Sequence, residues 1–95
     1  PAYVFHLIEA MAAAGEALGL SPELAAKSAL QTVAGAGELA RTAAEDPGTL
    51  RQNVTSPAGT TAAALNVLMA NPGQTELMTR AMTAARDRGR ELAKG

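Results

Sequence analysis

The chain has 95 residues, a net charge of −1 and no cysteine. This length suits a single domain, and the lack of cysteine excludes disulfides and thiolate metal sites. A charge this close to neutral gives no general attraction to nucleic acid or to an anionic membrane. No apolar run approaches the roughly 20 residues of a membrane span, so membrane insertion is not expected.

Small apolar side chains dominate the composition. Alanine occurs 23 times, whereas Tyr3 and Phe5 are the only aromatic residues. Each alanine buries little area, at roughly 25 cal/mol per Å² of apolar surface. The hydrophobic fraction of 47% is nevertheless that of a globular chain. We therefore expect closely packed helices whose packing is completed by a second chain.

The first predicted helix covers residues 3–18. Apolar side chains recur there at helical spacing, at Val4, Ile8, Met11 and Leu18. Gly19 follows the last of them and predicts the end of the helix, because glycine readily adopts the positive φ of a C-terminal cap.

The second predicted helix begins at Ser21, a typical N-cap, with Pro22 at the first helical position. It is expected to run to about Glu45 and to end before a turn at residues 46–48. Glycines inside an exposed helix cost about 1 kcal/mol each relative to alanine. The two inside this helix are therefore expected to mark a close crossing by another helix: Gly35 and Gly37.

The remaining pattern predicts a short helical turn at 49–53, a polar loop at 54–61 and a helix at 60–69. Asn-Pro-Gly at 71–73 ends that helix, and a last helix follows at about 75–93. No alternation typical of strands appears. The sequence thus predicts an all-α bundle of four main helices plus a short turn, forming one domain over residues 1–95.

The segment Thr55–Thr61 is the best candidate for a binding site. It is rich in hydroxyls, contains Gly59 and leads directly into a helix. A helix N-terminus offers unpaired N–H groups that suit a small carboxylate, and Thr60 or Thr61 could add a hydroxyl. The structural alternative is that serine and threonine merely cap the helix while proline and glycine shape a turn.

Other polar residues offer weaker candidates. His6 has no neighbouring ligands and Glu9 lies three positions away, so a structural pair is favoured over a metal site. The basic stretch 80–94 also contains acidic residues and no aromatics to stack bases, which indicates a solvated helix face and no nucleic-acid partner. Met78 and Met82 are predicted to lie in the core. No metal site and no catalytic acid–base pair is visible.

Four segments spread along the chain carry a family resemblance: Pro1–Phe5, Gly19–Ala25, Gln31–Ala36 and Thr55–Thr61. In this order they resemble the dimerisation domain of pyrroline-5-carboxylate reductases. Thr55–Thr61 reads T-S-P-A-G-T-T and is similar to that family's signature, usually T-S-P-G-G-T-T. Ala58 departs from that signature, and it would carry strain if the position needs a positive φ.

The resemblance implies a helical domain of the 6-phosphogluconate dehydrogenase C-terminal type, interlocked with a second chain as a homodimer or higher oligomer. It also implies a cytoplasmic enzyme that reduces 1-pyrroline-5-carboxylate to L-proline with NADPH or NADH. The chain begins at Pro1 and is expected to be the C-terminal part of that enzyme, inactive alone and without a cofactor site. The implied catalytic residue is Thr61, and the implied substrate-binding residues are Ser56, Pro57, Ala58, Gly59, Thr60 and Thr61.

Two other functions remain open from the sequence. One is a stand-alone helical interaction module without substrate. The other is a different dehydrogenase that pairs a Rossmann domain with a helical C-terminal domain. The hydroxyl-rich segment Thr55–Thr61 favours the proline enzyme over the second, and an upstream strand–glycine–helix unit would argue against the first.

Overall fold

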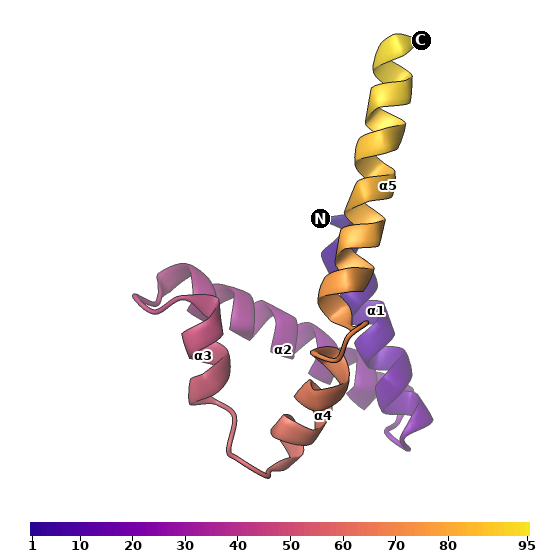
Figure 1. The fold of residues 1–95 in the computed structure, drawn as a ribbon. Coiled ribbons are helices and arrows are strands. Elements are labelled where there is room, and N and C mark those ends of the chain that lie inside the picture. The colour runs from indigo at the N-terminus through magenta and orange to yellow at the C-terminus, as the bar shows by residue number, and fades with distance from the viewer. The chain divides into compact units, whose positions relative to one another are not determined.

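A computed structural model describes residues 1–95, all of which fold into helices and short connections (Figure 1). The chain divides into two compact units, Pro1–Leu50 and Arg51–Gly95. The predicted all-α class is confirmed, with four main helices and one short one. Their bounds are α1 Ala2–Ala17, α2 Pro22–Thr42, α3 Pro47–Asn53, α4 Thr60–Leu68 and α5 Gln74–Lys94.

Gly19 ends α1 as predicted. Its φ of 108° lies in the region that favours glycine. The N–H of Leu20 donates to the carbonyl of Gly15 over 3.0 Å, and the N–H of Gly19 donates to that of Glu16 over 3.0 Å. This pair of bonds is the Schellman arrangement, which satisfies carbonyls that the helix itself leaves open.

Ser21 caps α2, also as predicted, because its Oγ accepts from the N–H of Leu24 over 3.2 Å. The predicted end at Glu45 is wrong, since α2 stops at Thr42. The predicted turn at 46–48 is wrong as well. Asp46 instead caps α3, its Oδ1 accepting from the N–H of Thr49 over 2.8 Å. The proline at the first helical position then starts α3 two residues earlier than expected.

Helices α1 and α2 pack through a line of small side chains. Ala25 and Ala29 of α2 are buried, with exposed fractions of 2% and 4%. Gly15 of α1 allows this approach, because a Cβ at that position would lie 3.2 Å from the Cβ of Ala25. The short side chains let the backbones come close, but they bury little apolar area.

Large apolar side chains are mostly exposed in the single chain. The predicted core residues Met78 and Met82 are 41% and 54% exposed, so that prediction is wrong for one chain by itself. Nothing lies within 4 Å of a Cβ built at Gly35 or Gly37. The close crossing predicted there is therefore not made by this chain. A second chain remains the expected partner for these surfaces.

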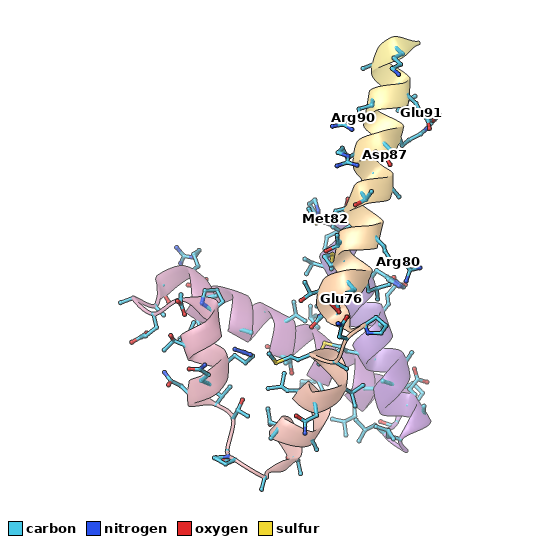
Figure 2. All side chains as sticks on the ribbon, in the orientation of Figure 1. Glu76, Arg80, Met82, Asp87, Arg90 and Glu91 are labelled. Atoms are coloured by element: carbon cyan, nitrogen blue, oxygen red, sulfur yellow. The ribbon has the colours of Figure 1, made fainter.

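Gly73 is the N-cap of α5, and its N–H donates to Oε1 of Glu76 over 2.6 Å. A Cβ at Gly73 would collide with the carbonyl oxygen of Ala70 and lie 2.5 Å from that of Leu68, so only glycine fits. Figure 2 shows that Arg90 and Glu91 project from opposite sides of α5 near its C-terminal end. No residue of α5 is buried, and in the single chain the helix exposes apolar side chains such as Leu77 and Leu92 as well as charged ones.

Candidate functional site

The predicted binding segment forms a tight turn before α4. The N–H of Gly59 donates to the carbonyl of Ser56 over 3.1 Å, which closes a four-residue turn with Pro57 at its second position. Ala58 occupies the third position with a φ of 61°. A positive φ there is the type II arrangement, in which glycine is strongly preferred. The strain foreseen for alanine at this position is thus present.

Thr55 fixes the start of this turn to the end of α3. Its hydroxyl donates to the carbonyl of Arg51 over 2.6 Å, and its N–H donates to the carbonyl of Gln52 over 3.1 Å. The hydroxyl bond is partly buried, so water competes with it less than at an exposed site. The side chain of Thr55 therefore orients the residues that follow it.

Gly59 brings the turn against the N-terminus of α4. It is the N-cap, and a Cβ there would lie 3.2 Å from the carbonyl oxygen of Ser56 and 3.3 Å from its Cβ. No side chain caps the helix. The first N–H groups of α4, from Thr60 onward, therefore point out of the helix without a partner in the chain.

The structure brings the predicted site residues together at this one place. Gly59 is half-buried, and the others are exposed: Ser56, Pro57, Ala58, Thr60 and Thr61. None of the side-chain hydroxyls among them has a partner within the chain, in contrast to that of Thr55. An exposed helix N-terminus beside free hydroxyls can accept a small carboxylate. The geometry of the turn fits that chemistry.

A groove beside this turn was missed by the sequence reasoning. It encloses about 240 Å³ and lies between the C-terminal end of α3 and one face of α4. The only sequence signal for this groove is Arg51, a basic residue four positions before Thr55. The lining residues are Arg51, Gln52, Thr55, Ala62, Leu65, Asn66 and Met69.

No acid–base centre accompanies the turn. The carboxylate of Glu38 raises the pKa of Arg41 through a hydrogen bond, and hydrogen bonds from Thr49 lower the pKa of Asp46. Both groups are exposed, and neither belongs to the segment Thr55–Thr61. No cluster of three or more acidic or histidine side chains could hold a metal ion. None of the helices is both long and apolar enough to cross a bilayer.

Comparison with known proteins decides the family. The family model described as pyrroline-5-carboxylate reductase dimerisation matches residues 1–92, almost the entire chain. The chain belongs to this family. The turn and the exposed apolar helices are therefore features of a dimerisation domain.

Individual relatives agree with the family model. A pyrroline-5-carboxylate reductase of Pseudomonas aeruginosa is 48% identical over 94 residues, covering 99% of this chain and 34% of the relative. The enzyme of Arabidopsis thaliana is 45% identical over 94 residues, with the same coverage. The chain thus spans about a third of the length of the curated relatives it matches.

A solved structure has the same fold. The pyrroline carboxylate reductase of Plasmodium falciparum, with NADP bound, superposes with a TM-score of 0.81 at 34% identity. The match covers 92% of this chain and 35% of that one. This family member therefore has the fold of the matched third of a known reductase.

Proposed function

We propose that this chain is the dimerisation and substrate-binding domain, over residues 1–95, of a cytoplasmic pyrroline-5-carboxylate reductase. The parent enzyme reduces 1-pyrroline-5-carboxylate to L-proline with NADPH or NADH. The observation that carries the proposal is the match of residues 1–92 to the dimerisation family. Relatives at 48% and 45% identity bear the same enzyme name.

The proposed substrate site is the turn and the N-terminus of α4. The open N–H groups of Thr60 and Thr61 hold the substrate carboxylate, together with the hydroxyl of Ser56. Pro57, Ala58 and Gly59 shape the backbone around it. The hydroxyl of Thr61 hydrogen-bonds near the ring nitrogen and is the proposed catalytic residue. Support comes from the unpartnered hydroxyls and the uncapped helix.

The residues of this chain hold and orient the substrate. The cofactor provides the hydride when bound, and binding energy spent on orientation lowers the barrier to its transfer. The described residues contain no strand followed by a glycine-rich turn and a helix, so they offer no dinucleotide site of the Rossmann type. We therefore propose that the nucleotide is held by other parts of the enzyme and that this chain alone is inactive.

We further propose that the domain forms a homodimer in which the two copies interlock. Exposed apolar side chains on every long helix support this, among them Phe5 at 66%, Leu77 at 60% and Leu92 at 64%. Apolar surface of this extent is stabilised by a partner chain. Within such a dimer, a helix of the second copy would cover Gly35 or Gly37.

The test is steady-state kinetics of the complete polypeptide that contains this chain, with 1-pyrroline-5-carboxylate and NADPH or NADH. Thr61→Val keeps the shape of the side chain but removes the hydroxyl. A lost hydrogen bond of about 1.4 kcal/mol lowers kcat/KM about tenfold. Thr42→Val is the matched control, because its hydroxyl bonds only to the carbonyl of Glu38 within α2.

Two results would overturn different parts of the proposal. Wild-type protein that forms dimers but turns over neither cofactor is the stand-alone interaction module, and the enzyme assignment fails. Turnover that is unchanged in Thr61→Val leaves the enzyme assignment intact but removes Thr61 from the site. A kcat/KM that falls equally in Thr42→Val would also remove the specific role of Thr61.

A further inference from the structure

Arg51 is a half-buried cation without a carboxylate partner. It takes part in none of the four ion pairs of the chain. Its Nη1 donates to the sulfur of Met69 over 3.1 Å, and a thioether is a weak acceptor. By contrast, Arg41 and Arg88 each pair with a glutamate one turn away. The guanidinium of Arg51 therefore keeps most of its hydrogen-bonding capacity unused.

The surroundings of Arg51 define what could satisfy it. The groove of about 240 Å³ that Arg51 lines is also lined by the polar residues Gln52 and Asn66 and by the apolar residues Leu65 and Met69. None of the proposed substrate residues 56–61 lines it. A planar carboxylate on a short apolar stem matches this lining, because a guanidinium binds a carboxylate through two parallel hydrogen bonds.

Charge is segregated between the two units of the chain. Pro1–Leu50 contains six carboxylates and two cations, a net charge of −4, and Arg51–Gly95 contains three carboxylates and six cations, a net charge of +3. Three exposed glutamates of the acidic unit have no hydrogen-bond or ion-pair partner in the chain: Glu16, Glu23 and Glu45. A second copy of the chain thus offers unpaired carboxylates of the kind that the groove lacks.

We propose that Arg51 is an ionic anchor of the homodimer, receiving in its groove a glutamate from the Pro1–Leu50 unit of a second copy. This inference rests on the proposed dimer and adds the residue that fixes its register. Contact with the second copy would shield the pair from water, which strengthens it relative to an exposed pair. The other unpaired arginines, Arg80 and Arg90, project from α5 as Figure 2 shows and are exposed.

The test measures the dimer dissociation constant of the complete polypeptide by sedimentation. Removing one partner of a desolvated charge pair leaves the other charge unsatisfied, so Arg51→Gln is expected to raise Kd about thirtyfold. Arg51→Glu is expected to raise it further. Arg90→Gln, an exposed arginine with no partner, is the matched control and is expected to stay within about threefold.

Charge reversal identifies the partner. Arg51→Glu is combined in turn with Glu16→Arg, Glu23→Arg and Glu45→Arg. One of the three combinations is expected to recover at least about tenfold of the lost affinity, because only that pair restores opposite charges in contact. Arg51→Lys keeps the positive charge but cannot donate two parallel hydrogen bonds to a carboxylate. Its dimer Kd is therefore expected to lie between those of the wild type and Arg51→Gln.

The possible outcomes distinguish failure of the Arg51 anchor from failure of the proposed homodimer. A wild-type protein that stays monomeric overturns the proposed homodimer and the anchor together. A wild-type dimer whose Kd is the same in Arg51→Gln overturns the anchor alone. The anchor is also overturned if Arg51→Gln instead raises KM for 1-pyrroline-5-carboxylate with Kd unchanged, because the carboxylate in the groove then belongs to a small molecule. Circular dichroism of each variant confirms that the helices are retained.

Discussion

Gly15 on α1 lies directly against Ala25 on α2. A Cβ on Gly15 would approach the Cβ of Ala25 to 3.2 Å and the Cδ1 of Leu20 to the same distance. Leu20 can rotate away, whereas the Cβ of a buried alanine is fixed to its helix. The absence of a Cβ at Gly15 therefore allows the close approach of the two helices of the N-terminal unit.

Gly15→Val is therefore expected to destabilise the N-terminal unit by about 1–3 kcal/mol, the usual cost of overpacking. Urea unfolding followed by circular dichroism measures the change. Gly89→Val is the control, because nothing lies within 4 Å of a Cβ at that glycine. Equal effects of the two substitutions would show that the spacing of α1 and α2 does not depend on Gly15.

Replacing Ala58 by glycine is predicted to raise the free energy of unfolding. Alanine with a φ of 61° pays about 1–2 kcal/mol for its left-handed conformation, while glycine costs roughly 0.5–1 kcal/mol in chain entropy. Ala58→Gly should thus stabilise the chain by about 0.5–1 kcal/mol in thermal or urea unfolding. Ala64→Gly, inside α4, is the opposite control and should cost about 1 kcal/mol. A loss of stability in both variants would contradict the strain at Ala58.

Asp46 makes stability depend on acidity. Hydrogen bonds from Thr49 lower the pKa of its carboxyl below the ordinary value of 3.8. Because the folded pKa is the lower one, this contribution to stability is fully present above the unfolded pKa and disappears as the pH falls through the folded pKa.

Asp46→Asn retains an acceptor at the cap and removes the titration. Its unfolding free energy should vary less than that of the wild type as the pH falls from about 5 toward about 2, a window placed about the ordinary aspartate pKa. Urea titrations at several pH values provide the measurement. A wild-type slope that persists unchanged in Asp46→Asn would assign the acid sensitivity to other carboxylates.

Only one of Gly35 and Gly37 is predicted to be covered by a helix of the partner in the dimer. They lie about 200° apart around α2, at about 100° per residue, so one crossing helix can cover only one of them. One of Gly35→Leu and Gly37→Leu should weaken dimerisation by about tenfold or more in sedimentation, and the other serves as its control. If Gly35→Leu and Gly37→Leu both dimerise with wild-type affinity, neither glycine faces a partner helix.

Much of the local structure followed from the sequence. Ser21 with Pro22 and Gly19 after an apolar helix placed two boundaries correctly, because caps satisfy backbone groups locally. The errors fell between α2 and α3. Asp46-Pro47 can either close a turn or begin a helix, and the local pattern does not separate the two.

The candidate site was located by its hydroxyls, its glycine and its family resemblance, whereas the Arg51 groove was not. The groove depends on how the end of α3, where the hydroxyl of Thr55 donates to the carbonyl of Arg51, lies against α4. The periodicity of apolar residues does not predict such a contact, because the residues that line the groove lie up to 18 positions apart.

The sequence by itself determined the all-α class, the cap at Ser21 and the stop at Gly19, since each of these follows from local hydrogen bonding or from the spacing of apolar side chains. Tertiary structure alone decided two things: that Gly15 meets Ala25 and that Arg51 lacks a carboxylate partner. Each depends on atoms brought together by chain geometry, and a linear pattern of residue types does not contain those distances.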